Sequence, residues 1–364
     1  MILYIHIPFC TSRCGYCVFN SYSGLDDLKD QYVEALCQDL RQNGWQNNKS
    51  LSSIFFGGGT PNTLDMNAYE KIFQTIRECY KLESDIEITL EANPNLITPE
   101  WCRALKSFGA NRLSFGVQSF FEDKLKFLER EHSRQDIDTA IEFARSSGFE
   151  NISIDLIYDT PLDNASRIKE EVMAANNLGI QHLSAYSLSI EKNSRLEKRG
   201  EIEKIESDFL ILLEMLSQFD FSQYEVSNFF HKGSGLKCRH NLSYWKGEDY
   251  IGCGAGAVGK ISLDHFKESD TGLLAKRFYT HQNIKNYILD PHYRKIEPLN
   301  HQDILLESLF LGLRSEIGVK IDSLDDRMQR RAEILLREKK LMIQDNRLFS
   351  CDYFLADELA LWLM

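Results

Sequence analysis

The 364-residue sequence lacks any apolar run near the roughly 18 consecutive residues that a membrane-spanning helix requires. Its first residues, MILYIHIPFC, also lack the basic flank and the small-residue cleavage site of a secretory signal peptide. Basic residues are in deficit, with 42 Lys and Arg against 54 Asp and Glu, which gives a formal net charge of −12. Because a nucleic-acid groove usually needs a basic face, we expect a cytoplasmic protein that binds no nucleic acid.

Cysteine occurs only nine times, too thinly spread for the disulfide framework of a small secreted domain. Six dispersed cysteines are interpreted mostly as small buried apolar side chains; they are Cys37, Cys79, Cys102, Cys238, Cys253 and Cys351. The other three, Cys10, Cys14 and Cys17, lie together in the segment HIPFCTSRCGYCVFN at 6–20. This cluster needs a separate explanation.

Up to about residue 230, short β-rich runs alternate with segments whose apolar residues recur at helical spacing. This rhythm predicts parallel strands joined by right-handed crossover helices. The predicted strands are 1–7, 51–58, 86–92, 111–118, 151–159, 182–190 and 223–229, and the helical segments include 28–42, 66–81, 133–147, 164–179 and 204–219.

Polar residues stand at the ends of successive predicted strands. The cysteine loop follows the first strand and GGGTPN follows the second, while Glu91 closes the third, Gln118 closes the fourth and Asp155 lies within the fifth. Such residues on so many strands favour the C-terminal rim of a barrel over a single crevice in an open sheet. We therefore predict an α/β fold built on a partial (β/α)6-type barrel.

After about residue 295 the pattern becomes helical and predicts a winged-helix-like module. Segments 297–315 and 323–340 are typical of amphipathic helices, 345–346 of a hairpin turn and 352–364 of a terminal helix. Since no basic recognition face is evident, we interpret this module as structural rather than DNA-binding. The expected division is 1–230 for the barrel with its cysteine loop at 8–20, 231–295 for an extension and 296–364 for the C-terminal module.

The spacing C-x3-C-x2-C lets one loop bring three thiolates around one metal centre. Thiolates are the ligands that iron–sulfur clusters and zinc prefer. Structural zinc wants four ligands, and His6 is a candidate for the fourth. Three ligands on a four-iron cluster instead leave one iron open to an outside molecule, so two kinds of metal centre stay open.

The segment CTSRCGYC, with an aromatic residue before its third cysteine, resembles the cluster loop of the radical S-adenosylmethionine (SAM) superfamily. The resemblance continues in order along the chain through YIHIPFC, FGGGTPN, LEANP, SFGVQSF, LEREH, IDLIYDTP and HNLSYW. Together these motifs are similar to the coproporphyrinogen oxidase-like branch, which contains oxygen-independent coproporphyrinogen III oxidases and heme chaperones. The likeness covers essentially the whole chain and implies the radical SAM barrel fold.

The resemblance implies that Cys10, Cys14 and Cys17 ligate a [4Fe-4S] cluster. In the superfamily, SAM chelates the open iron and is cleaved to methionine and a 5′-deoxyadenosyl radical. The positions that match the SAM contacts of the family are Tyr4, Tyr16, Gly58, Gly59, Thr60, Glu91, Gln118, Arg130 and Asp155. Taken alone, the polar residues among them equally suit structural ion pairs or helix caps, and the glycines suit a tight turn.

A second glycine-rich segment, YIGCGAGAVGK at 250–260, superficially resembles a phosphate-binding loop. No apolar strand precedes it and no Gly-Lys-Ser/Thr follows, so this signal is weak. The resemblance implies instead that the segment closes over the far end of the active-site opening.

Three features favour the chaperone over the oxidase. In the oxidase a fourth cysteine lies two residues after the third, where this sequence has Phe19, and the chaperones resemble this CxYCxF form. The chain also starts nine residues before Cys10, whereas the oxidase has a longer N-terminal segment, and HNLSYW at 240–245 resembles a chaperone signature. We expect a chaperone that delivers heme to recipient hemoproteins such as respiratory-chain components. The alternatives are an oxidase that decarboxylates coproporphyrinogen III and a radical core that acts on another substrate.

His240 is the candidate heme ligand, because imidazole is a good axial ligand of heme iron. A histidine that anchors a loop is the alternative interpretation. Cys238 is a second ligand candidate, and Tyr244 and Trp245 offer flat aromatic surface to a porphyrin. A homodimer is an expectation of the family alone. Transient contact with a membrane-associated recipient stays open, although no lipid anchor or basic amphipathic helix is evident.

Overall fold

The computed structural model describes residues 1–45, 49–201, 204, 206–263 and 272–364. Its centre is a 12-stranded sheet in the order β14-β13-β12-β11-β1-β4-β5-β6-β7-β8-β10-β9. Six neighbouring strands of this sheet run parallel, as the alternation of strands and helices predicts. They are β1 (Ile2–Ile7), β4 (Leu51–Gly58), β5 (Leu82–Ala92), β6 (Arg112–Gln118), β7 (Asn151–Tyr158) and β8 (His182–Ser187).

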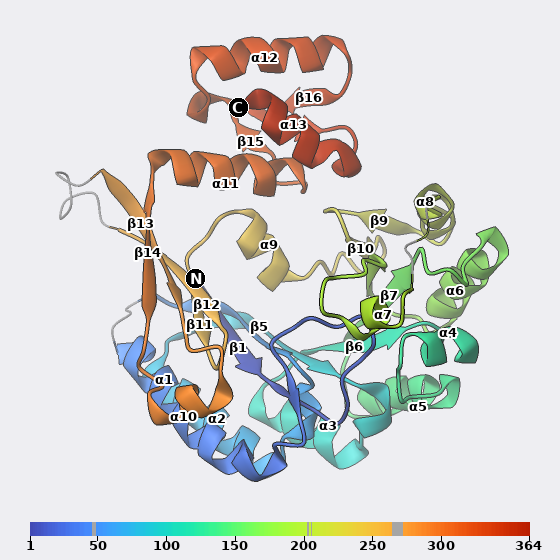
Figure 1. The fold of residues 1–364 in the computed structure, drawn as a ribbon, viewed down its shortest axis with the longest axis vertical. Coiled ribbons are helices and arrows are strands. Elements are labelled where there is room, and N and C mark those ends of the chain that lie inside the picture. The colour runs from blue at the N-terminus through green and yellow to red at the C-terminus, as the bar shows by residue number, and fades with distance from the viewer. Residues whose placement is uncertain (46–48, 202–203, 205, 264–271) are drawn as a thin grey trace.

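Helices cover the outer face of the parallel strands and leave the inner face to the site (Figure 1). Four of them begin at a side chain that accepts a hydrogen bond from a free amide of the first turn, namely Asp65, Thr98, Ser133 and Asn164. Their apolar stripes and the sheet share one hydrophobic core. The helices are α1 (Lys29–Trp45), α2 (Met66–Cys79), α3 (Pro99–Phe108), α4 (Glu122–Phe127), α5 (Arg134–Ser146), α6 (Ala165–Asn177) and α8 (Phe209–Gln218). The short α7 (Arg195–Lys198) instead packs against the cysteine loop, where Leu196 N donates to Gly15 O.

The prediction of one seventh strand at 223–229 is wrong. β9 (Phe221–Gln223) and β10 (Asn228–His231) form an antiparallel pair at one edge of the sheet. The residues between them turn away because their backbone pairs with a C-terminal segment: Val226 N donates to Arg314 O at 2.9 Å, and Glu316 N donates to Tyr224 O at 2.9 Å. The alternation of polar and apolar side chains along 223–229 correctly indicated an extended backbone. It does not identify the segment with which that backbone pairs.

At the opposite edge, β11 (Tyr250–Cys253) runs parallel to β1, and three antiparallel strands follow it. These are β12 (Val258–Ser262), β13 (Leu273–Tyr279) and β14 (Lys295–Asn300). Helix α10 (Ile284–Leu289) packs against α1. The helix predicted from 297 begins only at His301, because the preceding residues pair with β13 and Asn300 caps the helix.

The C-terminal residues form a helical module above the sheet (Figure 1). Helices α11 (His301–Leu313), α12 (Asp326–Arg337) and α13 (Ala356–Leu363) enclose a separate hydrophobic core beside the strands β15 (Val319–Lys320), β16 (Leu341–Gln344) and β17 (Arg347–Ser350). The predicted hairpin turn is present, with φ angles of 47° and 59° at Asp345 and Asn346. The division at 230 and 295 stays a prediction. In the described ranges, no helix has the length and apolar content that crossing a membrane demands.

Candidate functional site

The loop after β1 brings all three clustered cysteines to one cavity of about 490 Å³, called the cysteine cavity below. Cys10, Cys14 and Cys17 are free thiols, and each is partly exposed. Other segments hold the loop, since Gly15 N donates to Leu128 O at 3.1 Å and Leu196 N donates to Gly15 O at 2.9 Å. Burial raises the pKa of the Cys10 and Cys17 thiols. A metal centre bound there would therefore have to displace their protons.

The glycine turn after β4 forms the next wall of the cysteine cavity. Gly58 has a φ of 113°, and an added Cβ would lie 2.5 Å from the His6 ring. At Gly59 a Cβ would lie 2.7 Å from Phe9 O, so only glycine lets the two loops come this close. Thr60 then donates from Oγ1 to Cys10 Sγ at 3.5 Å. The turn is thus built directly against the cysteine loop.

Arg130 is one of two cations that line the cysteine cavity, and the other, Arg13, is exposed. Arg130 Nη1 donates to Cys14 Sγ at 3.1 Å, and its Nη2 donates to Asn93 Oδ1 at 2.8 Å and to Gly116 O at 2.6 Å. Its buried Nε has no hydrogen-bond partner among the described residues. The guanidinium can therefore attract an anionic group into the cavity without losing a carboxylate partner.

Glu91 and Asp155 bring two carboxyl groups to the same cavity from β5 and β7, and the exposed Glu191 also lines it. Glu91 accepts from Gly58 N at 3.3 Å. Burial, and then the charge of Asp155, raises the pKa of Glu91 to about 8. Burial also raises the pKa of Asp155 to about 6, against the opposing effects of Ser184, Arg112 and Arg130. Glu91 and Asp155 are thus poised to change protonation near neutral pH.

Gln118 and Tyr16 complete the set of predicted residues at the cysteine cavity. Gln118 ends β6 with a φ of 66°, a left-handed conformation that turns the chain sharply toward α4. Tyr16 lies between two of the cysteines in the sequence, and burial raises the pKa of its hydroxyl. The structure therefore gathers predicted residues from five of the six parallel strands and the loops that follow them, and Tyr186 and Ser187 of β8 line the cavity as well.

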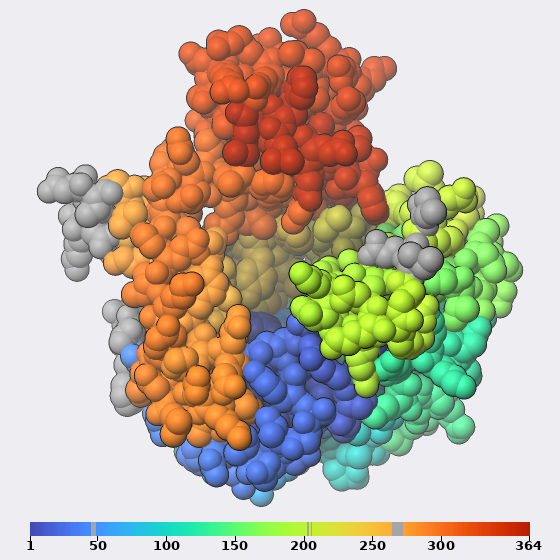
Figure 2. All heavy atoms as spheres, in the orientation of Figure 1, coloured from blue at the N-terminus to red at the C-terminus, as the bar shows by residue number. Residues whose placement is uncertain are grey.

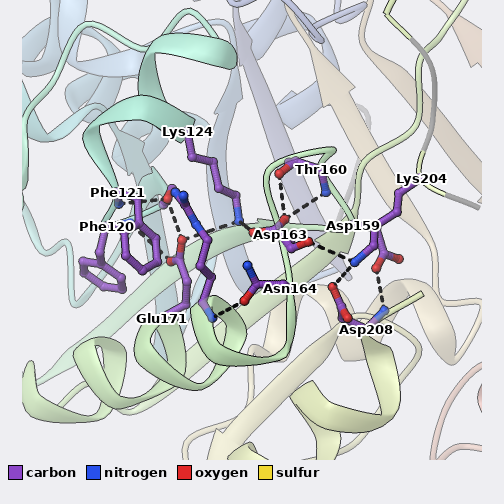
Figure 3. Close-up of polar contacts among 12 residues, drawn as sticks. Phe120, Phe121, Lys124, Asp159, Thr160, Asp163, Asn164, Glu171, Lys204 and Asp208 are labelled. Carbon is purple, nitrogen blue, oxygen red and sulfur yellow. Dashed lines mark hydrogen bonds and ion pairs between the residues drawn. The ribbon is translucent and has the colours of Figure 1, made fainter. Parts of the chain in front are cut away.

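A buried ion network supports the turn after Gln118 (Figure 3). Lys124 Nζ on α4 lies 2.8 Å from Asp163 Oδ1 and 3.4 Å from Glu171 Oε1, and all three side chains are almost fully buried. Ser119 Oγ donates to Glu171 Oε1 at 2.5 Å, which ties the turn to α6. The sequence gives no sign of this network, because its members are far apart in the chain and belong to no motif.

The donor set at the cysteine cavity fits a thiolate-ligated cluster better than a single zinc ion. Three soft sulfur donors line one cavity whose volume is within the range of small-molecule sites. Among the residues that the structure describes, no three His, Cys, Asp or Glu side chains are close enough together to hold one metal ion. His6 uses both ring nitrogens elsewhere: Nδ1 is 3.0 Å from Tyr4 Oη and Nε2 is 2.8 Å from Asn20 O.

A second cavity of about 550 Å³ adjoins the first, and both are lined by Phe19, Gly58, Glu91, Asp155 and Tyr186. Tyr4 lines this second cavity and not the cysteine cavity, unlike the other predicted SAM contacts. The glycine-rich segment 250–260 lines it with Tyr250, Gly256, Ala257 and Val258. Asn20 Nδ2 donates to Ala255 O of this segment at 2.9 Å. Figure 2 shows the molecule hollowed between the dark blue N-terminal residues, the orange strands and the C-terminal module, with the olive α9 (Arg239–Trp245) in the depth.

His240 lies at the second cavity on α9. Its Nδ1 is 2.7 Å from Ser53 Oγ, and its buried Nε2 has no hydrogen-bond partner among the described residues. Burial, and then the charge of Arg112, lowers the pKa of His240 to about 3, so the ring is neutral at pH 7. If Nδ1 donates to Ser53, Nε2 carries the lone pair that a metal ligand needs.

The other residues of the predicted heme site do not all lie at the second cavity. Tyr244 lines the second cavity, and its ring packs edge-on against His240 at a centroid distance of 5.0 Å. Trp245 instead lines a different cavity of about 330 Å³, between α9 and the C-terminal module. Cys238 lies fully buried, donates to Glu87 Oε1 at 3.6 Å and lines neither of these cavities. Cys238 therefore has no access to a ligand in the second cavity and is a poor candidate for a heme ligand.

Comparison with known proteins identifies the family. The model of the Radical SAM superfamily matches residues 4–184. The heme chaperone HemW of Bacillus subtilis is 35% identical over 87% of this chain and 84% of its own length, and HemW of Escherichia coli is 35% identical over 72% and 70%. HemW of Mycobacterium tuberculosis H37Rv is 31% identical over 95% of this chain and 90% of its own length.

The chain belongs to the HemW family of radical SAM proteins.

Membership in the radical SAM superfamily implies a [4Fe-4S] cluster and SAM as cofactors. A solved structure agrees with the fold: coproporphyrinogen III oxidase (HemN) from Escherichia coli superposes with a TM-score of 0.80 over 100% of this chain and 89% of its own. At 20% identity this likeness speaks to the fold alone. The α/β partial barrel with its C-terminal helices, predicted from the sequence, is therefore correct.

Proposed function

We propose that this HemW-family protein is a heme chaperone, which binds heme and transfers it to recipient hemoproteins. The observation that carries the proposal is the second cavity, where a neutral histidine lies among aromatic side chains and its Nε2 has no hydrogen-bond partner among the described residues. Its volume of about 550 Å³ suits a small-molecule ligand, and imidazole is an established type of heme-iron ligand. The names of the HemW relatives support the same function.

We propose further that the cysteine cavity holds the [4Fe-4S] cluster on Cys10, Cys14 and Cys17. When bound, the cluster supplies an electron to the sulfonium of SAM. In this proposal Arg130 attracts the carboxylate of SAM, while Glu91 and Asp155 accept hydrogen bonds from its ammonium and hydroxyl groups. The glycines at 58 and 59 keep the backbone close enough to touch the methionine part.

Phe19 distinguishes the chaperone proposal from an oxidase. Its side chain is 65% exposed at the point where the two cavities adjoin, and it occupies the position of the fourth cysteine of the oxidase motif. A benzyl side chain can neither ligate iron nor exchange a proton there. A cytoplasmic location, a homodimer and contact with a membrane-associated recipient stay predictions of this proposal.

The test is heme binding and transfer by protein reconstituted with its cluster under anaerobic conditions. We expect heme to bind, to move to an apo-hemoprotein acceptor, and to show a changed Soret band and weaker binding in His240→Ala. His292→Ala, an exposed histidine, is the matched control and should behave as the unaltered protein. Coproporphyrinogen III is supplied in parallel with SAM and a reductant; catalytic amounts of protoporphyrinogen would contradict the chaperone proposal and favour the oxidase.

A further inference from the structure

Arg112, the first residue of β6, is a buried cation that none of the site motifs includes. Only 2% of it is exposed, and it lines the second cavity together with His240 but not the cysteine cavity. Its Nη2 donates to His182 Nδ1 at 3.2 Å, whereas its Nε has no hydrogen-bond partner among the described residues. No carboxylate oxygen of the residues that the structure describes lies within 4.0 Å of the guanidinium nitrogens of Arg112.

The charge of Glu87 acts on Arg112 through space, but the hydrogen bonds of this carboxylate go to other residues. Glu87 accepts from Cys238 Sγ at 3.6 Å, from Arg239 N at 3.1 Å and from His240 N at 3.1 Å, so its carboxylate caps the start of α9. His182 is neutral, because burial lowers its pKa well below the usual value. A guanidinium stays protonated in proteins, and this one therefore keeps a positive charge without a direct ion-pair partner.

The nearest cavity carboxyls do not supply that partner either. Glu91 and Asp155 line both cavities. The charge of Arg112 lowers the pKa of each through space, and Asp155 in turn raises the pKa of Arg112. With a pKa raised to about 8, Glu91 is mostly protonated at pH 7. In the proposed function, moreover, both groups are engaged by SAM. A buried charge is costly unless it is paired, which points to an anion from outside the chain.

We propose that Arg112 binds a carboxylate of the porphyrin that occupies the second cavity, so that heme is held at two points, its iron by His240 and a propionate by Arg112. The inference rests on the proposed function and names the group on the ligand that the cavity recognises. Arginine suits this role because its planar fork matches a carboxylate with two parallel hydrogen bonds. Arg112 stands on strand β6 and His240 on helix α9, but both line the same cavity. A ligand that carries both an iron and a carboxylate requires this arrangement.

The test compares heme with its dimethyl ester, iron protoporphyrin IX in which both propionates are esterified. Binding of each is titrated by absorption under identical conditions. We expect the unaltered protein to bind heme at least about tenfold more tightly than the ester, since a lost charge-assisted hydrogen bond commonly costs this much. In Arg112→Gln the affinity for heme should fall to that for the ester, while the ester itself binds unchanged.

Arg112→Lys keeps the charge without the fork and should retain part of the preference. Arg277→Gln makes the same chemical change on β13, outside the second cavity, and should leave the preference intact. The comparison of the two ligands on the unaltered protein needs no variant. It therefore tests whether a propionate is recognised even if Arg112→Gln fails to fold, and Arg112→Lys then tests the residue.

The carboxylate of SAM has the same chemistry as a propionate, so SAM binding is measured by equilibrium dialysis on the same variants. If Arg112→Gln loses SAM affinity but keeps its preference for heme over the ester, the assignment to the porphyrin is wrong. Equal affinity of the unaltered protein for heme and ester overturns the assignment and leaves the proposed function standing. Absence of any heme binding would overturn the proposed function and this assignment with it.

Discussion

At the scale of single residues, the site is defined by ionisable groups held away from water. Burial raises the pKa of Glu91 to about 8 and that of Asp155 to about 6, while it lowers the pKa of His240 to about 3. Each of these changes favours the neutral form of its group. At pH 7 Glu91 and His240 are therefore mostly neutral, whereas the guanidiniums of Arg112 and Arg130 keep their charge. A charged ligand changes the protonation of the neutral groups when it binds.

Glu91→Gln should make the folded protein less sensitive to pH. The pKa of Glu91 is higher in the folded state, at about 8, than the ordinary value of 4.5 in the unfolded chain. The folded state thus binds the extra proton between these values, and its stability falls as pH rises from about 5 to about 8. In Glu91→Gln this fall should shrink by more than about 1.4 kcal/mol, the free energy that corresponds to a tenfold difference in proton affinity.

The measurement is the free energy of unfolding in urea at pH 5, 6.5 and 8. Glu142→Gln, on an exposed position of α5, is the control and should keep the pH dependence of the unaltered protein. An equally steep pH dependence in Glu91→Gln would show that this carboxyl is not the group that titrates.

The sequence predicted which residues meet at the cysteine cavity because their motifs lie at the ends of consecutive parallel strands, whose carboxyl ends meet at one edge. It did not predict that Tyr4 lines the second cavity. Tyr4 lies in the middle of β1, beside Phe55 of β4, and not at the strand end that leads into the cysteine loop. Arg112 was also missed. An arginine at the start of a strand carries no sequence signal that its ion-pair partner is absent.

At the scale of elements, the joint between β6, α4 and α6 depends on one buried lysine (Figure 3). Lys124 holds Asp163 and Glu171, and Glu171 in turn accepts hydrogen bonds from Ser119 Oγ and Phe120 N. Since Ser119 directly follows Gln118, this network fixes the corner at which β6 reaches the cysteine cavity.

Lys124→Met should destabilise the protein by about 3–5 kcal/mol at pH 7, because it leaves two buried carboxylates without their cation. Lower pH should restore part of the loss, since protonation removes the unpaired charge. Urea unfolding at pH 7 and pH 5 measures both effects. Lys126→Met, on the exposed side of the same helix, should change stability by less than about 0.5 kcal/mol at either pH. A loss that is independent of pH would contradict this account.

Elements were predicted well where periodicity and capping agree, as at α5, where Ser133 and Asp136 form a reciprocal capping box. They were predicted poorly where pairing between distant segments decides. Residues 223–229 break into two strands because 224–226 pair with 314–316, and α11 begins late because β14 pairs with β13. Such long-range pairing is not encoded in local patterns.

At the scale of the whole molecule, the described residues form two large hydrophobic cores, one above the other in Figure 1, and a small third cluster that contains Leu128 and Leu196. The first large core joins the sheet to its outer helices, and the second lies within the C-terminal module. The strand-like pairing of Glu225 with Ser315 and the ion pair of Lys237 with Glu316, at 2.6 Å, connect the two parts. We therefore propose that the C-terminal module, expected at 296–364, is a separate unit of stability.

Leu335→Ala should destabilise the C-terminal module by about 2–5 kcal/mol, because it opens a cavity in the second core. Hydrogen exchange should speed up in 309–363, while the parallel strands keep their protection and the cysteine cavity keeps its ability to take up a cluster. Leu216→Ala removes the same side-chain volume from the first core and should give the opposite distribution. If Leu335→Ala accelerates exchange equally in the central strands, the two cores unfold together. The residues around the cavity lined by Trp245, between α9 and the module, would then couple the two cores into one cooperative unit.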